Sequence, residues 1–194
     1  MGCWGITAFE SDAGLDAVAF IREQLPKDGM VELEKILEAL KQDEWNTPPE
    51  VKEASSHTNV MALAEVMVKL LERDFRQLDY DDKFCNLTSF TASRESVRWL
   101  RDYLSETLHS HIEHAKSEGG FGGWFKEKDW IGWQKHMSAL VERFDTMLTL
   151  SGDYFDLISP QLNEAEDVYK QSDEDSNRCN HVHREGFNGP GLGL

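Results

Sequence analysis

Apolar residues recur at helical spacing along most of this 194-residue chain. The clearest stretch runs from Leu33 to Leu40, where apolar residues stand at i, i+3, i+4 and i+7 and therefore share one face of a helix. Pro26, Pro48 and the glycines of 119–123 interrupt the pattern, because proline and glycine disfavour helix interiors. The spacing predicts six helices, over residues 12–25, 33–40, 60–71, 93–118, 130–148 and 160–171.

These amphipathic helices must bury their apolar faces against one another, which predicts an all-α, single-domain bundle of about six helices. We expect the helical domain to span residues 1–172, with an N-terminal part (1–75) and a long-helix part (93–172). Residues 75–92 show no sustained period and are expected to form a long connection, which could hold a short strand. Residues 173–194 are polar and then glycine-rich, which is typical of a disordered, flexible C-terminal tail.

The net charge of −16 is the most unusual bulk property, with 36 Asp and Glu against 20 Lys and Arg. Such a field repels nucleic acid and anionic membranes and attracts basic partners. We therefore expect a protein partner, for which a basic protein is the candidate, and neither nucleic acid nor membrane. A requirement for solubility alone is the simpler explanation of the same charge.

The chain has no run of about 18 apolar residues, so no transmembrane helix is expected. Its first residues lack the basic and then apolar segments of a secretory signal. Three widely spaced cysteines fit reduced thiols better than a disulfide framework. Together these features predict a cytoplasmic location.

The first residues follow the pattern M-G-x-W-G, then F-E-x-D, and the segment 53–71 reads EASSHTNVMALAEVMVKLL. In these motifs the chain resembles DUF4259, a mainly bacterial family of unknown function, over roughly residues 1–75. Cys3 and Ser11 stand where that family usually has alanine and asparagine. The resemblance implies a helical domain and supplies no activity, cofactor or catalytic residue. Residues 93–194 extend beyond the part for which we expect family resemblance.

The same opening residues are expected to anchor the fold. The anchor consists of Trp4, Gly5, Phe9 and Asp12. Trp4 and Phe9 should bury their rings in the bundle, and Gly5 should allow a tight turn. Acidic residues at 10, 12 and 16 could form a metal-binding cluster, but capping of the first helix explains them more simply.

Histidines on the helix over 93–118 are candidate metal ligands. His111 lies near the centre of the apolar stripe and His114 lies at its edge, so the two could form a two-histidine site. A hydrogen-bonded core histidine is the alternative identity for His111. A second candidate set, Cys179, His181 and His183, alternates along the tail and could bind Zn²⁺ or Cu²⁺, or could be incidental. Apart from such a divalent metal, no cofactor is predicted.

The segment GGFGGWF at 119–125 lacks the Gly-Lys-Ser/Thr of a nucleotide-binding loop and is expected to be an interhelical hinge. Its aromatic residues, Phe121, Trp124 and Phe125, are candidate partner-binding residues, because exposed aromatics make good interface anchors. They could instead fold back onto the core.

No motif in the chain nominates a catalytic residue. We therefore favour a non-enzymatic protein–protein interaction module, for example a toxin-neutralising immunity protein whose acidic surface captures a basic toxin. The alternative is a metal-dependent hydrolase that uses histidines and carboxylates carried on the helices.

Overall fold

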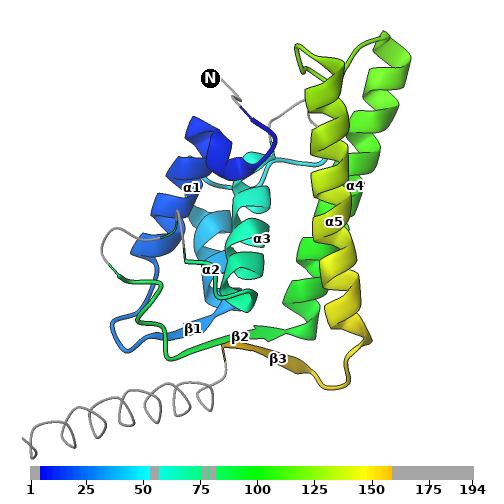
Figure 1. Ribbon diagram of the computed structural model, residues 1–194. Coiled ribbons are helices and arrows are strands. Elements are labelled where there is room, and N and C mark those ends of the chain that lie inside the picture. The colour runs from blue at the N-terminus through cyan, green and yellow to red at the C-terminus, as the bar shows by residue number, and fades with distance from the viewer. Residues whose placement is uncertain (1–4, 53–56, 76–77, 79–81, 159–194) are drawn as a thin grey trace, which may run out of the picture. The chain divides into compact units, whose positions relative to one another are not determined.

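Five α-helices, one 3₁₀-helix and three short strands make up the part of the chain that the computed structural model describes, residues 5–52, 57–75, 78 and 82–158 (Figure 1). The helices are η1 (Ala8–Glu10), α1 (Asp12–Glu23), α2 (Leu33–Gln42), α3 (Thr58–Leu71), α4 (Arg94–Glu118) and α5 (Glu127–Thr149). The strands are β1 (Met30–Glu32), β2 (Ser89–Ser93) and β3 (Tyr154–Ile158). The expected helix over 160–171 and the expected tail over 173–194 lie outside the described residues.

The structure is mostly helical, as expected, but the all-α prediction is wrong in detail because the three strands form a mixed sheet in the order β1-β2-β3. Strand β1 pairs with β2 in parallel, with Val31 opposite Phe90. Strand β2 pairs with β3 in antiparallel fashion, with Ala92 opposite Phe155. Side chains alternate between buried and less buried positions along β2, but a strand this short shows too few periods to identify from sequence.

The helix boundaries follow local capping chemistry. Ser11 caps α1, because its hydroxyl accepts a hydrogen bond from the Gly14 amide at 3.0 Å. Ser93 caps α4 in the same way, by accepting from the Ser96 amide at 3.1 Å. Gly119 ends α4 in the left-handed conformation, with φ of 70°, which favours glycine.

The core runs between the helices and includes side chains from all three strands. Helix α4 packs along α5, and α1 packs on α3, while the sheet lies across one end of the helices (Figure 1). The largest fully buried side chains include Phe84, Phe90, Phe144, Leu63 and Leu100. The predicted stripe from Leu33 to Leu40 is buried as expected.

Arg94 joins the start of α4 to the end of α5. Its guanidinium donates to the carbonyl oxygen of Leu148 at 2.7 Å, to that of Gly152 at 2.8 Å, and to that of Leu150. The same group lies 5.1 Å from the centre of the Phe155 ring. Since cations stabilise the C-terminal carbonyls of a helix, Arg94 fixes where the β2–α4 junction sits. That junction forms one wall of the pocket described next.

Candidate functional site

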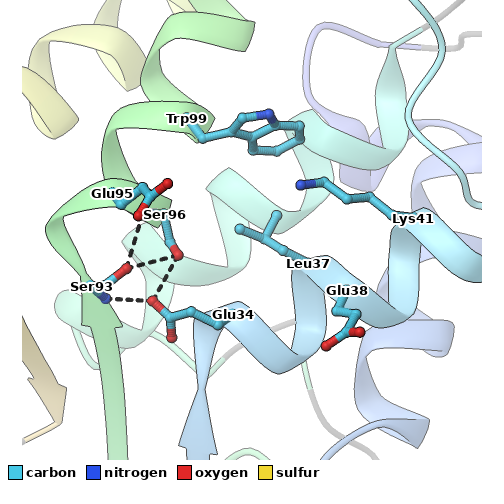
Figure 2. A pocket seen from close by; sticks show the side chains of 8 residues that line it. All are labelled: Glu34, Leu37, Glu38, Lys41, Ser93, Glu95, Ser96 and Trp99. Atoms are coloured by element: carbon cyan, nitrogen blue, oxygen red, sulfur yellow. Dashed lines mark hydrogen bonds between the residues drawn. The ribbon is translucent and has the colours of Figure 1, made fainter.

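A pocket of about 340 Å³ lies between α2 and the beginning of α4 (Figure 2). The chemically active side chains in its lining are Glu34, Glu38 and Lys41 from α2 and Glu95, Ser96 and Trp99 from α4. The two helices are distant in sequence and are brought together by the parallel pairing of β1, which leads into α2, with β2, which leads into α4.

Glu34 is the most strongly held carboxylate of the pocket. Its Oε1 accepts hydrogen bonds from the Ser93 amide at 2.6 Å and from the Ser96 hydroxyl at 2.7 Å (Figure 2). Burial alone would raise the pKa of Glu34, but the hydrogen bonds from Ser93 and Ser96 outweigh it and hold the pKa below its ordinary value. Glu34 is therefore a fixed negative charge that joins α2 to α4.

This hydrogen bonding predicts an acid-sensitive contribution to stability. The lowered folded-state pKa means that Glu34 stabilises the fold above its ordinary pKa of 4.5, and that this contribution is lost as the pH falls through the folded pKa. Urea unfolding at about pH 6 and about pH 3 should show wild type losing more unfolding free energy than Glu34→Gln. Glu106→Gln, at an exposed position of α4, is the matched control and should behave as wild type. Equal losses in Glu34→Gln and wild type would contradict the prediction.

Trp99 already carries one cation on its indole face. The Lys41 ammonium lies 4.5 Å from the ring centroid, a cation–π distance (Figure 2). The half-buried indole also packs against Tyr103, with ring centroids 5.4 Å apart. Within the described residues, Lys41 forms no ion pair at 4.0 Å or less. Three carboxylates and one ammonium line the pocket, so its lining has a negative charge balance.

A buried carboxylate lies on α3, away from this pocket. Glu65 is 5% exposed, and its Oε1 accepts from the Ala8 amide at 2.8 Å and lies 2.7 Å from Nε2 of His136 on α5. Its Oε2 is buried and has no hydrogen-bond partner in the described part of the chain. The contacts join η1, α3 and α5 around one charge, and they identify Glu65 as a structural centre that the sequence analysis missed.

Aromatic and imidazole rings pack between α3, α4 and α5. The Tyr103 hydroxyl donates to the Pro49 carbonyl at 2.8 Å, so Nδ1 of the buried His57, 2.7 Å away, is the donor to that hydroxyl. The ring of His111 lies 5.3 Å from those of His57 and Trp133. These contacts hold the entry to α3 against α4.

The two histidines of α4 that are candidate metal ligands, His111 and His114, have different contacts. Nδ1 of His111 donates to the Thr107 carbonyl at 2.9 Å, and its ring packs in the aromatic cluster. His114 is exposed, and its Nε2 lies 3.6 Å from a Glu118 carboxylate oxygen. In the described ranges no three His, Cys, Asp or Glu side chains are grouped to hold a metal ion. The other candidates, Cys179, His181 and His183, lie outside those ranges.

A family model for a domain of unknown function, DUF4259, matches residues 2–136. The chain belongs to the DUF4259 family. The match continues through α4 into α5, so the family extends well past residue 75, where we expected the resemblance to stop. No match was found among the curated proteins or the solved structures. None of the described helices of this DUF4259 chain is long and apolar enough to cross a membrane.

Residues 6–10 form a capped turn ahead of α1. Oε2 of Glu10 accepts from the Ile6 amide at 2.8 Å and from the Thr7 amide at 3.1 Å. The hydrogen bond from Thr7 is the largest cause of a lowered Glu10 pKa, which burial opposes. These contacts cap η1, whereas the cap of α1 is Ser11, so the geometry favours capping roles over a metal cluster for this segment.

The expected anchor residues of this DUF4259 chain occupy different environments. Phe9 is half-buried, with the Lys69 ammonium 5.2 Å from its ring centroid. A Cβ on Gly5 would lie 2.3 Å from the Glu10 carboxylate, so the turn needs glycine there. Asp12 is exposed as the first residue of α1. Trp4 lies outside the described residues.

The three candidate partner-binding aromatics of the α4–α5 loop differ in their exposure to solvent. Phe125 is 99% exposed and Phe121 is 40% exposed, whereas the half-buried Trp124 packs against the core. Positive φ angles at Gly119, Gly122 and Gly123 shape this turn at the end of the helical hairpin. The loop thus offers two aromatic rings to solvent rather than three.

Sequence reasoning missed the pocket and a further exposed aromatic residue. Trp45 is 88% exposed, in the turn between α2 and α3. Glu38, Glu95 and Trp99 look in the sequence like ordinary helix-surface residues, because nothing local shows that α2 and α4 will face each other. The available signal was the net charge of −16, which is spread along the chain and does not locate the pocket.

Proposed function

We propose that this DUF4259 protein is a non-enzymatic module that binds a basic protein partner. The observation that carries the proposal is the concentration of exposed acidic side chains on residues 5–52. Residues 5–52 contain eleven Asp and Glu against five Lys and Arg, and nine of those eleven acidic side chains are exposed. Such a surface accelerates encounter with a positively charged protein and disfavours acidic competitors.

Trp45 gives this acidic surface an apolar contact point. The turn that carries it is held by Asp43, whose Oδ1 accepts from the Trp45 amide at 3.0 Å and from the Asn46 amide at 2.8 Å. Nδ2 of Asn59 donates to the Asn46 carbonyl at 2.6 Å and ties the turn to α3. Tryptophan is enriched among the residues that dominate binding energy, and an ordered turn lowers the entropy lost when it is covered.

The more specific version of the proposal is a toxin-neutralising immunity protein, whose partner would be a basic, nuclease-type toxin. The acidic surface of residues 5–52 supports it, and Phe121 and Phe125 on the α4–α5 loop supply a second exposed contact. The metal-dependent hydrolase alternative would need a group of metal ligands that includes residues outside the described ranges.

The test has two steps on the full chain. In the first step, proteins from the native host that this chain retains are identified. In the second step, the partner is purified, and its binding to this chain is titrated calorimetrically at increasing salt. We expect a partner with net positive charge, and we expect its dissociation constant to rise with salt, as screening requires. For the immunity version, co-expression of this chain should restore growth to cells that produce the partner.

A pair of charge-matched variants makes the test specific. Glu44→Lys/Glu50→Lys reverses two exposed charges that flank Trp45, whereas Glu106→Lys/Glu142→Lys makes the same change in net charge on α4 and α5. We expect the first variant to weaken binding about tenfold more than the second. A partner without net positive charge, or equal effects of the two variants, would contradict the proposal.

A further inference from the structure

We infer that the pocket between α2 and α4 is an anchor site for one arginine side chain of the basic partner. The inference rests on the proposed function and names the group that the acidic surface recognises. The site is a pocket of about 340 Å³ whose lining includes an indole and carboxylates from two different helices. Binding pockets commonly combine such an apolar wall with a few placed polar groups.

The pocket lining has more negative than positive charges, which favours the binding of a second cation. Glu34 is held as a carboxylate by Ser93 and Ser96, so its charge is permanent at neutral pH. Glu38 accepts one hydrogen bond, from Gln42 at 3.1 Å through Oε1. Glu95 forms no ion pair with any of the described residues. Lys41 is the one cation among the described lining residues, so two of their three negative charges have no counterpart within that lining.

A neighbouring pocket of about 310 Å³ shows that local arginines do not supply that counterpart. Arg94 and Arg98 line it together with Glu95. Arg94 is engaged with the carbonyls at the end of α5, and no ion pair at 4.0 Å or less joins Glu95 to either arginine among the described residues. Glu95 therefore presents its charge between the two pockets without a direct partner.

Lys41 shows where the incoming cation would sit. Its ammonium rests on the indole of Trp99 at 4.5 Å, although three carboxylates line the same pocket (Figure 2). An exposed lysine side chain is readily displaced, because it loses little on returning to water. Once Lys41 has left the indole face of Trp99, a guanidinium fits that face better than an ammonium does. It is planar, stacks on aromatic rings, and directs several N–H donors to carboxylates at its edges.

The experiment uses a defined probe and the full-length chain. The indole N–H signal of Trp99 is identified by its absence from Trp99→Phe, and it is followed by NMR during titration with acetyl-Gly-Arg-Gly-amide. We expect a saturable shift of this signal. The peptide in which citrulline, the neutral isostere, replaces arginine should bind at least about fivefold more weakly, as should the lysine peptide. Free arginine should also bind more weakly, because the pocket repels its carboxylate.

Substitutions in the pocket should change the affinity for the arginine peptide in a specific pattern. Glu38→Gln and Glu95→Gln should each weaken binding of the arginine peptide about two- to fivefold, which is the range for solvent-exposed ion pairs. Lys41→Met should strengthen binding, because it removes the internal competitor and one positive charge. Glu106→Gln, on an exposed position of α4 outside the pocket, should leave the titration unchanged.

The outcomes separate this inference from the proposed function. An unmoved Trp99 signal, equal binding of the citrulline peptide, preferred binding of the lysine peptide, or an unchanged dissociation constant in Glu38→Gln/Glu95→Gln would overturn the arginine site. Tighter binding of free arginine than of the peptide would also overturn it, in favour of a metabolite site. A basic host partner that still binds Glu38→Gln/Glu95→Gln normally would defeat the inference and leave the proposed function standing. If the arginine peptide binds but no basic partner is found in the host, the arginine site would stand and the proposed function would fail.

Discussion

Gly14→Ala is expected to destabilise the protein by about 3 kcal/mol, although alanine is the better helix former. A Cβ on Gly14 would lie 1.9 Å from the carbonyl oxygen of Ala8 and 2.5 Å from its carbon. Both are backbone atoms, so no rotamer change can relieve the overlap. Overpacking of this kind costs about 1–3 kcal/mol or more, and loss of the Ser11 cap adds about 1 kcal/mol, against a helix-propensity gain of about 1 kcal/mol.

The sign of the effect makes this prediction easy to check. Helix propensity alone predicts that the variant is more stable, whereas the contact between α1 and η1 predicts that it is less stable. Urea unfolding followed by circular dichroism measures the difference. Gly120→Ala is the control, because a Cβ there would meet no atom within 4 Å. Equal unfolding free energies for the two variants would show that α1 and η1 can separate without cost.

His136→Ala is expected to lower the unfolding free energy by about 3 kcal/mol, because it strands the Glu65 carboxylate in the interior. Glu65 is 5% exposed, and only the Ala8 amide would remain to support its charge. Breaking a buried pair by removing one partner costs about 3–5 kcal/mol, and the 25% exposure of the His136 side chain puts the expectation at the lower end.

A double-mutant cycle separates the charge effect from lost packing. In a Glu65→Gln background the buried group is neutral, so His136→Ala should cost clearly less than in wild type. His109→Ala, at an exposed position of α4, should leave stability within about 0.5 kcal/mol of wild type. The same cost for His136→Ala in both backgrounds would mean that the imidazole contributes by packing alone.

The helices were predictable because their signals are local. The expected ranges 33–40, 60–71 and 130–148 fall inside α2, α3 and α5, and the expected start at Ser93 is the N-cap of α4. Each of these elements is specified by side chains three or four residues apart, together with a capping residue or a break. The sheet was not predictable in this way. Strand β1 has three residues, and its partner Ser89 lies 59 positions after Met30, so no short window contains the evidence for pairing.

The sequence by itself determined the helical class, the acidic surface and most helix ends, since periodicity, charge and capping are all encoded within a few residues. The tertiary structure alone decided the roles of particular polar residues. Glu65 sits in an apolar helix and meets His136 only because α3 packs on α5, 71 positions away in sequence. Glu38 and Trp99 became walls of one pocket only when β1 and β2 paired. Burial and charge balance depend on which surfaces meet, and that is a property of the packed chain.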